Sequence, residues 1–211
     1  MTLATILEAS CQQTESSDLL KETLAAIGML AVVPEHRDAL ITLQVITHVL
    51  TAARENLKIS QVVKTALGSL INLTSGKESD MLAKDPSYYQ VLYSVIEEIQ
   101  DKGTSDYVLK LVSNTLHIPV AMDNYQSGAL IPWLWKLLQS AQDPRRVLLG
   151  VRVLRQLFNG GAKGRLKLTQ ADLNMPHALT SLVLRIWEEA LMMEEIEVFN
   201  EAMLFLADVI D

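Results

Sequence analysis

The sequence predicts an all-α fold of stacked helical repeats, arranged as a right-handed α-solenoid. Apolar residues recur at three- and four-residue spacing along almost the whole chain, which is typical of amphipathic helices. No segment shows the alternating pattern of a strand bounded by hairpin turns. Of the 211 residues, 49% are hydrophobic, with only 9 Gly and 6 Pro. Such a chain is too apolar to be disordered and too poor in Gly and Pro to be dominated by loops.

The third observation is an internal repeat. Five helical segments end in similar apolar patterns, and consecutive ends lie 39 to 49 residues apart. This period is typical of helical repeat arrays, in which one unit cannot bury its apolar face alone and stacking buries a continuous core. The last apolar residues of the five segments are Leu30, Leu73, Ile118, Leu157 and Leu206.

The boundaries of the helices follow from polar and Gly/Pro clusters. A first short helix is expected over Thr2–Ala9, before the first repeat pattern. The polar stretch Ala121–Ser127 predicts a loop. Thr104–Asp106 is interpreted as a cap that precedes a helix, and Asp143 as a cap before a helix with Pro144 in its first turn.

Several segments resemble the armadillo repeat. The second-helix opening of that family is similar to Gly128–Leu134, and its third-helix ending is similar to Ala66–Leu73. The resemblance covers most of residues 20–210 and implies about four to five degenerate repeats in one domain, residues 1–211. Residues 1–19 are then an N-terminal cap or a partial repeat, so the chain either starts with a degenerate cap or is a fragment of a longer solenoid. The first repeat is recognised in Ala25–Ala31, His36–Ile41 and Val45–Leu50.

Charge and cysteine content exclude several classes of protein. Lys and Arg total 18 and Asp and Glu total 25, and the net charge of −7 argues against a general nucleic-acid binder. The single cysteine excludes an internal disulfide framework and a Cys-rich zinc site. No apolar run reaches the roughly 18–20 residues of a membrane span, and no signal peptide is recognisable. We therefore expect an intracellular protein, cytoplasmic or nuclear.

No pattern of catalytic or metal-ligating residues stands out. The four histidines lack the spacing of a metal site. Gly160–Gly164 is rich in glycine, but it has no Gly-Lys-Ser/Thr ending and follows no strand, so it is interpreted as a loop and not as a phosphate cradle. The acids of residues 188–201 are interpreted as a solvated face. We expect no enzymatic activity, no cofactor and no metal.

The armadillo resemblance implies where a binding surface lies. In that family the third helices line the concave face, and an Asn before the terminal Leu clamps the backbone of an extended peptide, because its amide offers a donor and an acceptor. The position that often holds Trp in the family carries no Trp in any repeat, and one of its residues is Gly68. Binding of nuclear-import signals is therefore not expected. The Asn column reads Met29, Asn72, His117, Gln156 and Phe205.

A basic patch accompanies this groove. Residues 144–171 hold seven Lys and Arg and no acid. Arg152 and Arg155 share a helical face, and Lys110 is expected to extend the patch. Two interpretations stay open. The guanidinium groups either capture carboxylates or phosphates of a partner, or form a solvated face paired with nearby acids such as those of residues 188–201.

The leading hypothesis is a non-catalytic protein–protein interaction module whose concave groove binds a partner segment with an acidic or amide-rich motif. The alternative is a structural section of a larger solenoid scaffold that assembles through exposed ends, with apolar residues exposed at Leu3–Leu7 or Leu204–Ile210. The partner is expected to be another protein, with no membrane and no nucleic acid, and the homo-oligomeric state stays open. The residues predicted to bind the partner are Asn72, Lys110, Asn114, His117, Arg152, Arg155 and Gln156.

Overall fold

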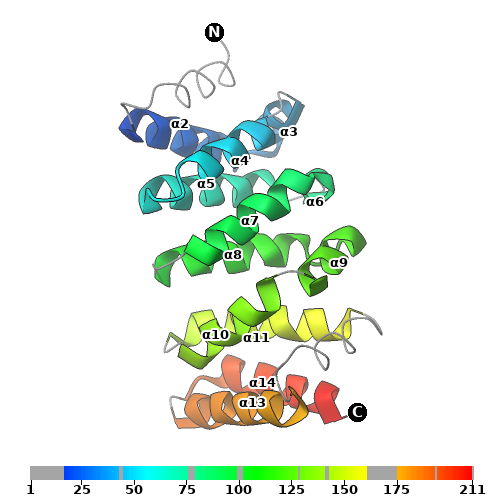
Figure 1. The fold of residues 1–211 in the computed structure, drawn as a ribbon. Coiled ribbons are helices and arrows are strands. Elements are labelled where there is room, and N and C mark those ends of the chain that lie inside the picture. The colour runs from blue at the N-terminus through cyan, green and yellow to red at the C-terminus, as the bar shows by residue number, and fades with distance from the viewer. Residues whose placement is uncertain are drawn as a thin grey trace. The chain divides into compact units, whose positions relative to one another are not determined.

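The protein is all-α, as predicted. Helices separated by short turns make up the described part of the chain, and no strand occurs there. The helices, labelled in Figure 1, fall into two compact units, residues 1–120 and 121–211. The sequence predicts a single domain over residues 1–211, and this stays a prediction. The computed structural model describes residues 17–42, 45–75, 79–98, 102–127, 129–140, 143–160, 175–192 and 194–210.

Unit 1 starts with one long helix and continues with two triplets, each made of a short, a medium and a long helix. We refer to the long helix that ends each triplet as a third helix, and α2 takes the same position ahead of the first triplet. The helices are α2 (Ser17–Leu30), α3 (Pro34–Thr42), α4 (Val45–Glu55), α5 (Ser60–Leu73), α6 (Ser79–Lys84), α7 (Pro86–Glu98) and α8 (Lys102–Thr115).

Helices of the same rank stack on one another in unit 1. The third helices form the series α2, α5 and α8, in which each packs on the next, and the second helix α4 packs on α7. Helix α5 lies in the middle of this stack, between α2 and α8. Its apolar side chains recur at helical spacing and are buried by these neighbours. Val63, Leu67 and Leu70 are almost fully buried, as are Ala66 and Leu73. A core of this kind is continuous from one repeat to the next.

Unit 2 repeats the pattern of triplets. It contains α9 (Pro119–Ser127) from Ala121 onward, α10 (Leu130–Ser140), α11 (Pro144–Asn159), α13 (Met175–Met192) and α14 (Ile196–Ile210). The third helix α11 packs on α14, which also packs on α13. The rings of Phe158 and Phe205 meet edge to face at 5.8 Å in the core between α11 and α14.

The start of α11 confirms one predicted helix boundary. The Asp143 carboxylate accepts a hydrogen bond from the Arg145 N–H at 3.0 Å, and Pro144 occupies the first turn. The proline has no N–H to leave unsatisfied, and the carboxylate satisfies one of the other free N–H groups of the first turn. The first helix expected over Thr2–Ala9 lies outside the described residues.

Two predicted boundaries are wrong. The stretch Ala121–Ser127 forms most of α9 and is not a loop, because Ala121 and Tyr125 lie one turn apart and are fully buried. Thr104–Asp106 lies inside α8, which starts at Lys102. Thr104 and Ser105 are 3% exposed, so packing outweighs the preference of these small polar residues for caps.

Close approach of α2 and α5 depends on a glycine. A Cβ atom on Gly28 would lie 2.9 Å from Ser69 Oγ and 3.3 Å from Ser69 Cα. Ser69 Oγ donates a hydrogen bond to the Leu24 carbonyl at 2.7 Å, and its side chain is buried. The two backbones therefore approach closely enough for a serine on one helix to bond a carbonyl of the other.

We predict that Gly28→Val lowers the free energy of unfolding by about 1–3 kcal/mol more than Gly68→Val does. Glycine is replaced by valine within a helix in both variants, so most of the difference in helix propensity cancels. A Cβ atom on Gly68 would lie 3.3 Å from Tyr107 Cε1, in a half-exposed side chain that has room to move. Urea unfolding followed by circular dichroism measures the difference, and equal losses for the two variants would contradict the close-approach argument.

Candidate functional site

A groove lies on the third helices of unit 1. It encloses about 420 Å³ and is bordered by side chains of α2, α5 and α8. A volume of this size is within the range of ligand and peptide-side-chain pockets. The lining residues are Ala25, Gly28, Met29, Gln61, Lys64, Thr65, Gly68, Ser69, Ile71, Asn72, Tyr107 and Lys110.

Small residues open this groove and larger apolar ones form its walls. Gly28 and Gly68 have no side chains to fill it. Tyr107 from α8 lies next to Gly68, as the 3.3 Å approach of its ring to a Cβ at that position shows. Met29 is 74% exposed at the α2 side, an unusual exposure for a large apolar side chain.

The charged side chains that border the groove are basic. Among the described residues that line it, the ionisable groups are the ammonium groups of Lys64 and Lys110 and the Tyr107 hydroxyl, and none is a carboxylate. Lys110 is exposed and Lys64 is half-buried. An anionic group in the groove would therefore meet complementary charge in a protein with a net charge of −7.

Two predicted residues connect the third helices to one another. Asn72 Nδ2 donates a hydrogen bond to the Gly28 carbonyl at 2.9 Å, and Asn114 Nδ2 donates to the Ile71 carbonyl at 3.2 Å. Each asparagine thus reaches back to the preceding third helix. These contacts orient the amide groups in advance, so a partner segment at Asn72 would meet a side chain that Gly28 already holds in place.

The predicted Asn column is wrong at His117. Helix α8 ends at Thr115, and His117 is an exposed residue of the following turn. Asn114 is the counterpart of Asn72, because both make the same contact to the preceding helix. The sequence misplaced the column because Leu116 and Ile118 are buried beyond the helix end and extend its apolar pattern.

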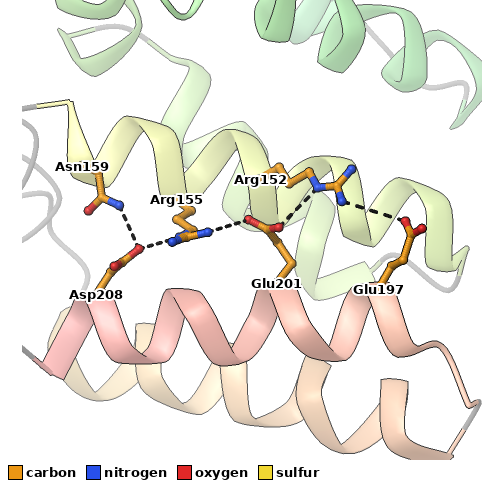
Figure 2. Close-up of polar contacts among 6 residues, drawn as sticks. All are labelled: Arg152, Arg155, Asn159, Glu197, Glu201 and Asp208. Atoms are coloured by element: carbon orange, nitrogen blue, oxygen red, sulfur yellow. Dashed lines mark hydrogen bonds and ion pairs between the residues drawn. The ribbon is translucent and has the colours of Figure 1, made fainter.

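The predicted arginine patch lies in unit 2, where it is paired with acids. Arg152 Nε lies 3.3 Å from Glu201 Oε2 and Arg152 Nη2 lies 3.9 Å from Glu197 Oε2 (Figure 2). Arg155 contacts Glu201 at 3.2 Å and Asp208 at 2.5 Å. The hydrogen bond to Asp208 is the main cause that raises the pKa of the Arg155 guanidinium.

This network bridges α11 and α14, as Figure 2 shows. Asn159 Nδ2 extends it with a 2.8 Å hydrogen bond to Asp208 Oδ2. The arrangement is the second of the two interpretations of the patch, in which the arginines pair with acids of the same chain. A partner carboxylate would have to displace Glu201 or Asp208 to reach Arg155. Gln156 is exposed on α11 outside this network.

Sequence reasoning located part of the groove and missed the rest. Two of the predicted residues, Asn72 and Lys110, are among its lining residues, and Asn114 makes the contact next to it. That they bind a partner stays a prediction. Lys64 and Tyr107 were not predicted. The signal for Lys64 was available, because it precedes Gly68 by one helical turn and shares its face. Tyr107 comes from the next repeat and could be placed beside Gly68 only by the packing of α8 on α5.

Within the described residues, no group of three or more His, Cys, Asp and Glu side chains could hold a metal ion. None of the helices described is long and apolar enough to cross a membrane.

Comparisons with known proteins give the class of fold. No protein-family profile and no curated protein matches the chain. An engineered protein solved by a structural genomics consortium matches with a TM-score of 0.67 and 15% identity, over 99% of this chain and 97% of the other. A designed armadillo repeat protein matches with a TM-score of 0.60 and 14% identity, over 99% of this chain and 100% of the other. The chain has an armadillo-like repeat fold.

We predict that Arg155 and Asp208 couple in a double-mutant cycle by about 1 kcal/mol, because both side chains are only 26% exposed. Glu201 also contacts Arg155, and Asn159 also contacts Asp208. The measurement is urea unfolding of Arg155→Ala, Asp208→Ala and the double variant. The coupling should shrink at 1 M NaCl as screening increases. The control cycle at Lys21 and Asp18, where the aspartate is 90% exposed, should give less than about 0.5 kcal/mol. Equal coupling energies in the two cycles would show that the Arg155–Asp208 contact contributes no more to stability than an exposed surface ion pair.

Proposed function

We propose that this protein is a non-catalytic interaction module that holds a segment of a partner protein in the groove of α2, α5 and α8. The observation that supports the proposal is the groove itself, with its glycine floor, its exposed Met29 and Tyr107, and lysines as its only charged lining residues. Armadillo-like repeats offer extended surfaces of stacked helices on which a chain segment can bind.

The aromatic wall of the groove supports binding of side chains from an extended segment. Gly68 stands where the family often carries Trp, and the ring of Tyr107 lies beside it. A tyrosine ring supplies flat apolar area at low cost in conformational entropy and keeps a polar hydroxyl at its edge. The groove thus retains an aromatic contact that comes from the neighbouring helix.

The two lysines indicate the chemistry of the partner. Lys64 and Lys110 favour carboxylates, while Gln61, Thr65 and Asn72 offer groups that hydrogen-bond to amides. We therefore keep the acidic or amide-rich motif as the proposed ligand and assign it to this groove. Arg152 and Arg155 are not part of the proposal, because their charges are compensated by Glu197, Glu201 and Asp208.

Absence of catalysis is part of the proposal. No histidine, cysteine or carboxylate lines the groove, and these are the groups that most often act as general acid, base or nucleophile. Lys64 is half-buried and Lys110 is exposed, so both ammonium groups remain in contact with water. The geometry favours binding over reaction.

We predict that peptides selected against the full chain from a random display library are enriched in Asp and Glu. A selected peptide should bind Lys64→Glu/Lys110→Glu at least 10-fold more weakly than the unchanged protein, because two attractive charges become repulsive. The matched control is Lys58→Glu/Lys84→Glu, which reverses two exposed lysines of the same unit outside the groove. Fluorescence anisotropy measures the affinities. Equal affinity for the two double variants would exclude the groove as the binding site.

A second candidate function is a structural section of a larger scaffold that assembles through its exposed ends. It is favoured by the exposure of Leu204, 49%, at the start of one of the two segments where the sequence predicts an apolar end. Met203, just before this segment on α14, is also 45% exposed. The other segment, Leu3–Leu7, lies outside the described residues. Large apolar side chains exposed together on one helix are typical of interaction surfaces.

A further inference from the structure

The helix pair α13 and α14 carries an apolar surface with a regular pattern. On α13, Leu184 and Leu191 lie seven residues apart with Trp187 between them. On α14, Ile196, Phe199 and Met203 repeat the same spacing. Residues at positions i, i+3 and i+7 share one face of a helix, so each helix presents one apolar stripe. We call these side chains the six-residue surface: Leu184, Trp187, Leu191, Ile196, Phe199 and Met203.

The two stripes meet at an aromatic pair. The rings of Trp187 and Phe199 lie 5.7 Å apart, and both side chains are half-buried. Around them, Leu184 is 41% exposed, Leu191 56%, Ile196 72% and Met203 45%. Aromatic anchors surrounded by apolar side chains are typical of the centre of a protein–protein interface.

Polar contacts fix which sides of the two helices face the rest of unit 2. On α14, Glu201 and Asp208 point toward the arginines of α11 (Figure 2). On α13, Arg185 Nη2 donates a 2.8 Å hydrogen bond to the Leu138 carbonyl of α10. Glu201 lies two residues before Met203, which is about 200° around the helix. The six-residue surface is therefore on the other side of the pair from α11.

Acidic side chains border this surface. Glu188 lies on α13 between Leu184 and Leu191, and Glu194 and Glu195 lie at the turn to α14. All three are exposed, and none forms an ion pair within the described part of the chain. Arg185 does not neutralise the charge of these three glutamates, because its guanidinium forms an ion pair with Glu189 at 3.1 Å. A partner with positive charges beside its apolar contacts is thus complementary.

The same charges argue against a second copy of this chain. A symmetric dimer over this surface would bring two sets of Glu188, Glu194 and Glu195 together around an apolar centre, where like charges repel strongly. A membrane with anionic lipids is disfavoured for the same reason. A partner helix fits this surface best. Each apolar stripe spans seven residues, which is about 10 Å, and this length matches about two turns of a helix packed against it.

We infer that the six-residue surface docks an amphipathic helix of another protein, with its apolar stripe on Trp187 and Phe199 and with Lys or Arg beside Glu188, Glu194 and Glu195. The inference rests on the second candidate function and names the kind of helix that the exposed end accepts. It is independent of the groove in unit 1.

The test uses the full chain and two fluorescein-labelled pools of helical peptides. Both pools carry the same randomised apolar stripe, and they differ only in flanking positions, which are Lys in one pool and Glu in the other. The basic pool should bind with a Kd at least 10-fold lower than the acidic pool. Leu191→Ser/Ile196→Ser should weaken that binding at least 10-fold. The control Val32→Ser/Val33→Ser, which changes two exposed apolar side chains of unit 1 outside the groove, should leave it unchanged.

Charge reversal separates the inference from the candidate function on which it rests. Glu188→Lys/Glu195→Lys should reverse the preference in favour of the acidic pool; Glu194 is left in place because its φ of 58° makes it sensitive to change. If Leu191→Ser/Ile196→Ser abolishes binding but charge reversal does not change which pool binds more tightly, the six-residue surface binds helices, but the inferred basic charge of the partner is wrong. If neither pool responds to these variants, the docking surface itself is wrong. A dimer in sedimentation velocity that Leu191→Ser/Ile196→Ser dissolves would identify a second copy as the occupant and overturn the inference.

Discussion

Contact between successive third helices is the interaction on which the rest of unit 1 depends. Ser69 Oγ and Asn72 Nδ2 bond carbonyls of α2 that lie 45 and 44 residues earlier in the chain. These bonds form because Gly28 lets the two backbones approach, and the apolar side chains of α5 are buried on either side. A polar contact buried between two repeats fixes their register, since a shifted register would leave its donor and acceptor unsatisfied.

The same contact shapes the groove that we propose as a binding surface. Small residues where α2, α5 and α8 meet leave a cavity of about 420 Å³, and the side chains at its edges come from three different helices. Rigid helices hold these groups in place, so little conformational entropy is lost when a segment binds. The close packing of α2 on α5 and the groove beside it are therefore two consequences of one sequence feature, the glycine at an interhelical contact.

Unit 2 uses charge where unit 1 uses small polar side chains. Its third helices α11 and α14 are joined by Arg152, Arg155, Glu201 and Asp208 along the edge of an apolar core (Figure 2). Partly buried ion pairs of this kind specify which helix faces meet, although each adds little to stability. The acids of α14 that pair with these arginines face α11, whereas Glu188, Glu194 and Glu195 border the six-residue surface on the other side of the helix pair.

The sequence by itself determined the all-α class, the repeat and its period, because each depends on apolar spacing within one helix. It also singled out Asn72 and Lys110, which the structure shows among the residues that line the groove. Only the tertiary structure decided that Asn114 and not His117 is the counterpart of Asn72, and that Arg152 and Arg155 face acids of α14. The reason is physical: these outcomes depend on contacts between residues more than 40 positions apart, and helical spacing carries no information about which side chains of a neighbouring repeat will be opposite.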